Sequence, residues 1–240
     1  MKKLVLVIPC YNPIDNWEQN LLDSYNEFCN NIGYDCNVVL VNDGCKNDIS
    51  KQVDVLKSVL KEKLIYVIHD INKGKGAALK TGVAQSESDI YMFTDIDFPY
   101  TTKSMVAIFN EANNKNGIVS GYRKSEYYEH LSRARTFISK ALRFFNTYIL
   151  ALPTNDTQCG LKAFDNDVKK LFVACQTDRF LLDLELLLSV NAHKLEIHPV
   201  HVSLNEGVTF TKFNYIVLFQ ELGNFIKLII KYRIYYRFIK

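Results

Sequence analysis

The 240-residue sequence has little that would set it apart from an ordinary globular protein. Ten glycines and five prolines are too few for a collagen-like or low-complexity chain. Hydrophobic residues make up 48% and charged residues 23%, a balance that excludes an intrinsically disordered chain. No run of 18 uncharged apolar residues occurs, so the sequence predicts no transmembrane helix.

The six cysteines are scattered along the chain and form no Cys-x-x-Cys pair. This usage is typical of reduced thiols in the cytoplasm and argues against a disulfide framework or a zinc site. The apolar run after Lys2 and Lys3 is too short for a signal peptide and is broken at Pro9. It predicts a first β-strand instead.

The net charge of +3 is too small to indicate a nucleic-acid partner, but it is unevenly distributed. Residues 214–240 carry five Lys and Arg against Glu221 alone, a local charge of +4, which leaves −1 for residues 1–213. We therefore predict one domain over 1–213 and a basic, aromatic tail over 214–240 that associates peripherally with the cytoplasmic face of a membrane. As a helix, the tail has one apolar face, formed by Phe225, Leu228, Ile229, Tyr232, Tyr235, Tyr236 and Ile239. Packing of this face on the protein's own domain is the alternative.

Strand and helix signals alternate along the chain. The predicted strands are Leu4–Ile8, Val38–Val41, Leu64–Ile68, Ile90–Phe93, Ile118–Ser120 and Lys194–Val202. Helices are predicted over residues 15–31, 48–61, 76–83, 102–113, 130–150 and 214–240. Asp15 and Glu18 have the spacing of a capping box at the start of the first helix. The alternation predicts an α/β fold, with a doubly wound, mostly parallel sheet covered by helices on both faces.

Polar clusters follow four of the predicted strands, at the point where each strand ends. They are Tyr11-Asn12, Asn42-Asp43-Gly44, Asp70 through Lys75, and Asp95-Ile96-Asp97. Ligands of parallel sheets bind beyond the carboxyl ends of the strands. The four clusters are therefore predicted to gather at one edge of the sheet and to form the functional site.

Asp95 and Asp97 are the candidate metal ligands of this edge. Residues i and i+2 of an extended chain point the same way, so both carboxylates can face one ion. Mg²⁺ or Mn²⁺ prefers such oxygens and also binds diphosphate. A helix cap plus a surface acid is the alternative for this pair. The glycine-rich turn of residues 72–76 opens a helix, which indicates either a phosphate site or a plain helix entry.

The polar clusters and several later segments resemble family 2 glycosyltransferases, in particular the branch of dolichyl- and polyprenyl-phosphate sugar synthases. The early matching motifs are Pro9-Cys10-Tyr11-Asn12, Val41-Asn42-Asp43-Gly44, residues 72–82 and Thr94-Asp95-Ile96-Asp97. The later ones are Gly121-Tyr122-Arg123, Arg135-x-x-x-Ser139, residues 156–164 and Asp183-Leu184-Glu185-Leu186-Leu187. Pro13 and Pro99 depart from the family pattern, which usually has Glu and often has a metal-binding Gln at these positions.

The resemblance implies a GT-A fold and inverting transfer from a nucleotide-diphosphate sugar. It implies that the base and ribose are held by Tyr11 and Asp43, within a donor site that includes Pro9, Asn12, Gly44 and Lys75. It assigns Mg²⁺ or Mn²⁺ to Asp95 and Asp97. It further implies acceptor-phosphate or donor-sugar contacts for Arg123, Arg135 and Ser139, with Asp156 and Gln158 as further substrate contacts.

The acceptor decides whether a general base is needed. A polyprenyl phosphate is already ionised, and cations such as Arg need only position it. A glycan hydroxyl in surface-polysaccharide assembly requires a base, and Asp156, Asp183 and Glu185 are the late candidates. A sugar nucleotidyltransferase would need a glycine-rich loop after the first strand, which Cys10-Tyr11-Asn12-Pro13 does not provide. A degenerate, non-catalytic transferase is the remaining alternative, and the Asp95/Asp97 pair argues against it.

Overall fold

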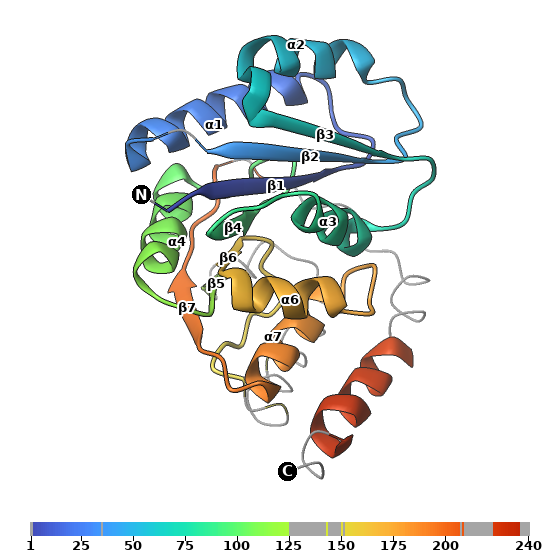
Figure 1. Ribbon diagram of the computed structural model, residues 1–240, viewed down its shortest axis with the longest axis vertical. Helices are drawn as coiled ribbons and strands as arrows, with labels where there is room; N and C mark the ends of the chain where they lie inside the picture. The colour runs from blue at the N-terminus through green and yellow to red at the C-terminus, as the bar shows by residue number, and fades with distance from the viewer. Residues whose placement is uncertain are drawn as a thin grey trace.

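The computed structural model describes residues 2–34, 36–124, 143, 150, 152–206, 208 and 223–235. Its centre is a seven-stranded sheet with the order β3-β2-β1-β4-β6-β5-β7 (Figure 1). The strands are β1 (Leu4–Cys10), β2 (Asn37–Asp43), β3 (Leu64–His69), β4 (Ile90–Phe93), β5 (Ile118–Tyr122), β6 (Lys162–Phe164) and β7 (Ile197–His201). The six predicted strands are present, which confirms the α/β class with a mostly parallel sheet.

β6 is the strand that the sequence did not predict. It lies between β4 and β5 and is antiparallel to both, whereas the other pairings in the sheet are parallel. With only three residues, it is too short to give an alternating or continuous apolar signal. Its position places the loop that precedes it beside the end of β4.

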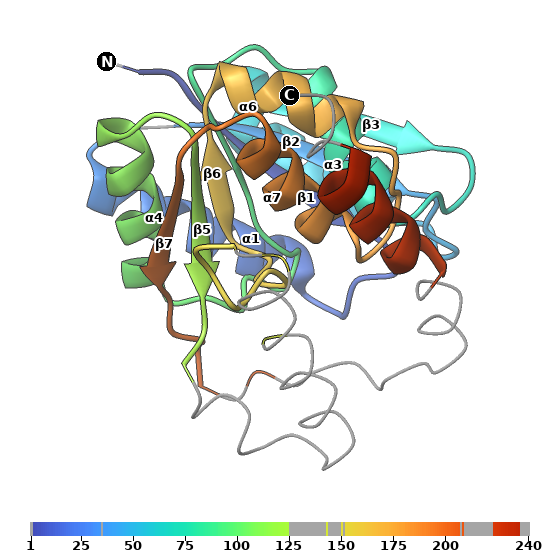
Figure 2. The same cartoon turned by 90° about the horizontal axis from the view of Figure 1, so that it is seen from below.

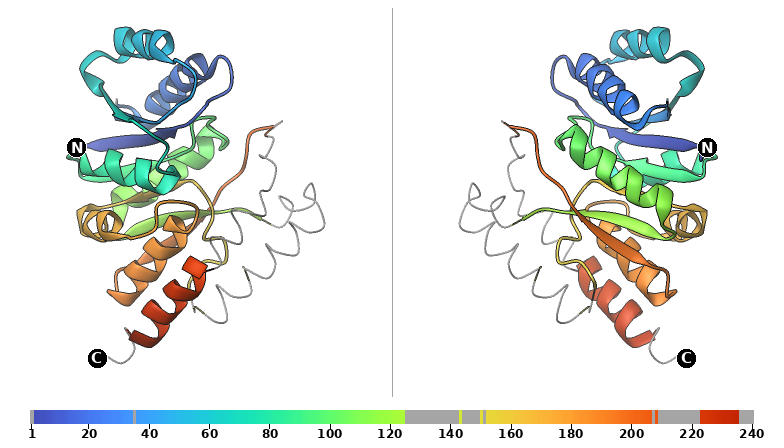
Figure 3. Two further views of the ribbon diagram at one scale, coloured as in Figure 1. Left: turned by 90° about the vertical axis from the view of Figure 1, so that its right-hand side faces the viewer. Right: turned by 90° about the vertical axis from the view of Figure 1, so that its left-hand side faces the viewer.

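The helices cover both faces of the sheet, as predicted (Figure 3). They are α1 (Trp17–Ile32), α2 (Ser50–Leu60), α3 (Lys75–Ala84), α4 (Thr102–Asn114), α6 (Asn166–Ala174) and α7 (Leu182–Ala192), with a 3-10 turn at Lys61–Lys63. Alternate residues of β1 divide between two cores, as the pleat of a strand requires. Leu4, Leu6 and Ile8 pack with α1, α2 and α4, and Val5 and Val7 pack with α3, α6 and α7.

The start of α1 differs from the prediction. The helix begins at Trp17, and the residue before it, Asn16, has left-handed backbone angles and makes no side-chain cap. The predicted capping box of Asp15 and Glu18 is therefore wrong. Residues 12–18 instead form one wall of a pocket, so tertiary contacts of this loop outweigh the local capping preference.

The described part of the tail packs on the domain. Residues 223–229 are α-helical and continue into a π-helix at Ile230–Tyr235, which lies beside α7 (Figure 2). Leu228 is 5% exposed, and Phe225, Ile229 and Tyr232 pack against the core that contains α7. For these residues the apolar face packs on the domain, which was the alternative to packing on a membrane. The interfacial role of the whole tail stays a prediction.

Within the part of the chain that the structure describes, no helix combines the length and the apolar character that a membrane span requires. The predicted helix of residues 130–150 lies outside the described residues, apart from Arg143 and Leu150.

Candidate active site

Asp43, at the end of β2, is a buried carboxylate that organises the loop after β3. The residue is 2% exposed. Its side chain accepts hydrogen bonds from Asn72 Nδ2 at 2.9 Å, Lys73 N at 2.9 Å and Gly74 N at 2.8 Å. His69 Nδ1 lies 2.8 Å from Asp43 Oδ1. The carboxylate is thus held by the protein itself, and it shapes the turn that leads to Lys75.

Gly44 lets this turn cross the end of β2 at close range. Its backbone has a φ of 68°, which a residue with a side chain rarely adopts. A Cβ at Gly44 would also lie 2.5 Å from Asn72 N and from the carbonyl carbon of Ile71. Only glycine therefore allows residues 71–72 to run over this point.

The residues after β1 take different positions at the same edge. Pro9 is buried opposite Val41 of β2. Tyr11 is 42% exposed, so its ring is open to solvent. Asn12 Oδ1 accepts a hydrogen bond from Lys46 N at 2.8 Å, which ties this loop to the loop after β2.

Asp95, Asp97 and Lys75 come together beyond the end of β4, as the sequence predicts for this edge. The Lys75 ammonium forms an ion pair with Asp95. Desolvation and then the charge of Asp95 raise the pKa of Asp97 above its ordinary value. Two carboxylates that repel each other in this way fit a hard dication, whose charge would stabilise both. Among the described residues, no cluster of three or more His, Cys, Asp or Glu suited to a metal is present.

The turn before Lys75 is a helix entry that is already covered by protein. Ala77 N donates to the carbonyl of Asp178 at 3.1 Å. A Cβ at Gly76 would lie 2.8 Å from the carbonyl carbon of Asp178. Of the two interpretations of residues 72–76, the plain helix entry therefore agrees with these contacts, and Lys75 is the group of this turn that reaches the carboxylates.

The loop of residues 156–162 closes the site from the side of β6. The register of β4 and β6 places Lys162 opposite Phe93, two residues before Asp95. Gly160 N donates to Tyr100 Oη at 2.8 Å. A Cβ on Gly160 would lie 2.6 Å from Asp95 Oδ2 and 3.2 Å from Lys75 Nζ. The backbone at Gly160 thus packs directly on the Lys75–Asp95 pair.

Arg123 and Asp156 form a two-pronged ion pair at the edge of the site. Arg123 Nε lies 2.8 Å from Asp156 Oδ2, and Arg123 Nη2 lies 2.9 Å from Oδ1. Asp156 is 3% exposed. Burial alone would raise the pKa of this carboxyl, but Arg123 holds it below its ordinary value. Asp156 is therefore a stable anion that orients Arg123.

Lys162 and Asp183 form a second, more deeply buried pair. Lys162 is 0% exposed and lies 2.5 Å from Asp183 Oδ1. The same ammonium also donates to the carbonyls of Thr157 and Cys159. Lys162 thus links the 156–162 loop to α7, and its positive charge balances the negative charge of Asp183.

Glu185 follows Asp183 by two residues in α7 and is fully buried. Its carboxylate accepts hydrogen bonds from Gln176 N, Thr177 N and Thr177 Oγ1 at 2.8–3.0 Å. Lys231 of the C-terminal helix lies 3.3 Å away. Burial opposes ionisation, but the hydrogen bonds and Lys231 lower the pKa of Glu185. These contacts link the loop before α7 to the C-terminal helix.

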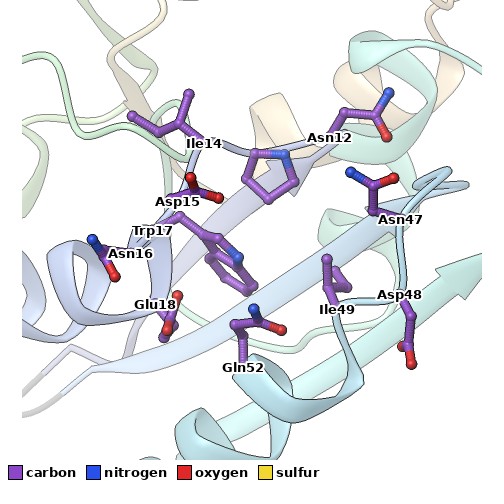
Figure 4. Close-up of a pocket in the computed structure, with 11 residues that line it drawn as sticks. Asn12, Ile14, Asp15, Asn16, Trp17, Glu18, Asn47, Asp48, Ile49 and Gln52 are labelled. Atoms are coloured by element: carbon purple, nitrogen blue, oxygen red, sulfur yellow. The ribbon is translucent and has the colours of Figure 1, made fainter.

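A separate pocket of about 590 Å³ opens between the β1–α1 and β2–α2 loops (Figure 4). Its polar lining residues are Asn12, Asp15, Asn16, Glu18, Asn47, Asp48 and Gln52. Asn12 is the one predicted site residue that it includes, and Asp95 and Asp97 do not line it.

The remaining predicted residues are placed as follows. Gln158 is exposed within the 156–162 loop. Arg135 and Ser139 lie outside the described residues. The sequence analysis did not single out His69, Gly160 or Lys162, which contact Asp43, Asp95 and Asp183 in the structure. Lys162 had one signal, because it is a lone charge in the apolar run Leu161–Phe164.

Comparison with known proteins identifies the family. The family model for Glycosyl transferase family 2 matches residues 5–172. This chain belongs to that family. Family membership agrees with the prediction that the candidate donor residues meet at one edge of the sheet.

Relatives of the family 2 chain include two transferases whose names contain dolichyl phosphate or undecaprenyl phosphate. A dolichyl-phosphate beta-glucosyltransferase of Trichomonas vaginalis is 29% identical over 83% of this chain and 65% of its own length. An undecaprenyl-phosphate 4-deoxy-4-formamido-L-arabinose transferase of Pseudomonas fluorescens is 25% identical over 84% of this chain and 58% of its own length. The chain thus spans about three-fifths of the length of these relatives.

Solved structures confirm that the family 2 chain has the GT-A fold. Glucosyl-3-phosphoglycerate synthase from Mycobacterium tuberculosis, in complex with Mg²⁺ and UDP, superposes with a TM-score of 0.65 at 13% identity, over 96% of this chain and 79% of its own. A mannosyltransferase from Pyrobaculum calidifontis, in complex with GDP-mannose and Mn²⁺, superposes with a TM-score of 0.62 at 15% identity, over 94% of this chain and 64% of its own.

Proposed function

We propose that this glycosyltransferase moves a sugar, with inversion, from a nucleotide-diphosphate sugar to a polyprenyl phosphate such as a dolichyl or undecaprenyl phosphate. The observation that carries the proposal is that the three candidate bases, Asp156, Asp183 and Glu185, are each paired with other groups of the protein. Asp156 is paired with Arg123, Asp183 with Lys162, and Glu185 with Lys231 and the Gln176–Thr177 loop. Carboxylates engaged with cations in this way are not free to approach and deprotonate an incoming hydroxyl, so the arrangement favours an acceptor that is already ionised.

The donor side of the proposal rests on Asp95, Asp97 and Lys75. Asp95 and Asp97 would hold Mg²⁺ or Mn²⁺, because they provide two adjacent carboxylates of which one has a raised pKa. A bound dication would stabilise the negative charge that forms on the departing diphosphate. Lys75 supplies a further positive charge at the same place.

The nucleotide itself would lie against the ends of β1 and β2. Tyr11 offers an exposed ring on which a base can stack. Pro9, Asn12 and Gly44 shape the neighbouring backbone, and Asp43 holds the turn of residues 72–74 in place.

The acceptor phosphate would be positioned by Arg123, together with Arg135 and Ser139. Asp156 orients the Arg123 guanidinium through two parallel contacts, which preorganises it for a phosphate. The names of the dolichyl- and undecaprenyl-phosphate relatives support a lipid acceptor. A lipid acceptor and the basic tail both support a location at the cytoplasmic face of a membrane.

The decisive experiment compares two acceptors that differ only in the phosphate. The purified protein is incubated with Mn²⁺, a panel of nucleotide sugars and either polyprenyl phosphate or the corresponding polyprenol, and products are identified by mass spectrometry. We expect transfer to the phosphate alone. Transfer to the polyprenol or to a soluble sugar would instead support a hydroxyl acceptor, and Asp183→Asn would then be expected to abolish it because only a neutral nucleophile needs a base.

A further inference from the structure

Lys75 is paired with one carboxylate and is influenced by the charges of two others. Its ammonium pairs with Asp95, and the charges of Asp183 and Asp97 also act on it. The side chain is still 28% exposed, and its four-carbon stem is flexible. Lys75 can therefore change partners when a better one arrives.

Asp95 cannot serve this lysine and a dication equally well. A dication held by Asp95 and Asp97 needs carboxylate oxygens that the Lys75 ammonium now contacts. Asp95 has little room to turn away, because Asp95 Oδ2 lies 2.6 Å from the point where a Cβ of Gly160 would be. Two cations on one carboxylate also repel each other. Lys75 and the dication consequently compete, unless Lys75 is given another anion.

We propose that Lys75 blocks Asp95 in the free protein and moves to the diphosphate when the nucleotide sugar binds, so that the dication binds tightly only together with the donor. This inference rests on the proposed function, because it assumes a diphosphate donor. The diphosphate supplies the replacement anion that frees Asp95. By linkage, the donor and the dication raise each other's affinity by the same factor.

The test measures Mn²⁺ binding to the purified full chain by electron paramagnetic resonance, in the absence of nucleotide. Lys75→Met is expected to bind Mn²⁺ about tenfold more tightly than the wild-type protein, a gain of about 1.4 kcal/mol. Saturating UDP or GDP is expected to strengthen Mn²⁺ binding strongly in the wild-type protein and much less in the variant.

Three controls test whether the effect depends on the charge of Lys75, on its position and on Asp95. Lys75→Arg keeps the charge and is expected to behave as wild type. Lys73→Met removes a charge from an exposed side chain of the same turn and is expected to leave the Mn²⁺ affinity unchanged. In an Asp95→Asn background, Lys75→Met is expected to give no gain, because the competed carboxylate is gone.

The possible results distinguish this inference from the function on which it rests. Mn²⁺ binding that is no tighter in Lys75→Met, while nucleotide still strengthens it, overturns the inference. Weaker Mn²⁺ binding together with a lower unfolding midpoint also overturns it, since Lys75 would then only support the 156–162 loop. Absence of Mn²⁺ binding in every variant, even with nucleotide, contradicts the proposed metal-dependent function instead. If Lys75→Met does not fold, Lys75→Gln carries the same test, because its amide is neutral but still polar.

Discussion

Asp43 is a buried carboxylate that several groups of the protein hold in place. Its oxygens contact Asn72, Lys73 N, Gly74 N and His69, and these contacts hold the turn that ends at Lys75. The resemblance to family 2 implies that Asp43 holds the nucleotide directly. The buried contacts favour an indirect effect, in which Asp43 shapes the loop against which the nucleotide would lie.

Replacement of Asp43 by Ala tests this indirect effect. Asp43→Ala leaves two backbone N–H groups, an amide and His69 without their acceptor, so we expect the free energy of unfolding to fall by about 3 kcal/mol. Donor binding should weaken together with stability. Urea denaturation and calorimetric titration with the nucleotide sugar measure both effects, with the exposed Asp54→Ala as control. Normal stability combined with lost donor binding would instead indicate a direct nucleotide contact.

Asp97 is predicted to contribute to the transfer reaction and not to the stability of the fold. Asp97→Asn should lower kcat/KM at least about 100-fold, because the charge on the leaving diphosphate is less well compensated. Its raised pKa means that the ionised form is disfavoured in the folded protein, so the variant should unfold at the same temperature or slightly higher. Steady-state kinetics and thermal unfolding check this, with Asp23→Asn on the exposed side of α1 as control. Full activity of Asp97→Asn, or of the wild-type protein in chelator, would contradict metal-dependent transfer.

At the scale of elements, the short strand β6 decides how the site is closed. It inserts antiparallel between β4 and β5, and this carries the 156–162 loop to the end of β4. Three contacts then hold the loop: Arg123 N donates to Asp156, Gly160 N donates to Tyr100 Oη, and Lys162 Nζ donates to the carbonyl of Cys159. The backbone can approach the Lys75–Asp95 pair because residue 160 is a glycine.

A methyl group at position 160 should disturb the pair without unfolding the protein. In Gly160→Ala the Cβ meets the end of the Asp95 side chain and the Lys75 ammonium, so the crowding falls on this ion pair. We expect kcat/KM to fall about tenfold and the free energy of unfolding to change by less than about 1 kcal/mol. Gly223→Ala, where a Cβ has no neighbour within 4 Å, is the control and should keep full activity. Equal activity of the two variants would show that the 160 backbone does not restrain Asp95.

Glu185 makes the contact between α7 and the C-terminal helix dependent on pH. Because its pKa is lowered by folding, its contribution to stability is complete above the unfolded value of about 4.5 and is lost as the pH falls through the folded value. Glu185→Gln should therefore be less stable at neutral pH and lose less stability between about pH 5 and pH 3. Urea denaturation as a function of pH measures this, with Glu27→Gln on α1 as control. Parallel pH profiles of wild type and Glu185→Gln would contradict the assignment.

At the scale of the whole molecule, charge is concentrated at the C-terminal end of the sequence. Residues 214–240 carry +4 against −1 for the rest. The apolar stripe at Phe225, Leu228, Ile229 and Tyr232 packs on the domain, and the outer side of the same helix leaves Ile226 and Ile230 about half exposed beside Lys227. Any membrane contact of this stretch therefore has to use the outer side and its cations.

Charge reversal on this outer side tests the association with membranes. Lys227→Glu should weaken binding to anionic vesicles about tenfold or more, because each cation near such a surface contributes about 1 kcal/mol and reversal also adds repulsion. High salt should release the wild-type protein, since the attraction is screened. Vesicle co-sedimentation measures both, and Lys103→Glu on α4 serves as the matched control. Equal binding to anionic and neutral vesicles, insensitive to salt, would contradict the prediction.

The alternation of strand and helix signals was sufficient to predict the class of fold and the edge of the sheet that the polar clusters follow. Parallel strands must present their carboxyl ends together, so the clusters after β1, β2, β3 and β4 had to meet. The charge of Asp95 acts on Asp97, so the two carboxylates are near each other as predicted, but the chain at residues 96–97 is a turn, with a hydrogen bond from Phe98 N to Asp95 O, and not the extended chain that the i, i+2 argument assumed.

Only the tertiary structure decided which of these groups are engaged with one another. The His, Arg and Lys partners of Asp43, Asp156, Asp183 and Glu185 are 21 to 46 residues away in the sequence, and no local pattern specifies these contacts. The three-residue β6 carries no periodic signal, yet its register places Gly160 against Asp95. The amphipathic face of residues 225–232 could cover a membrane or a domain equally well, and packing against α7 decided between them for this segment. Sequence periodicity defines which face of an element is apolar, whereas the partner of that face depends on the packing of the whole chain.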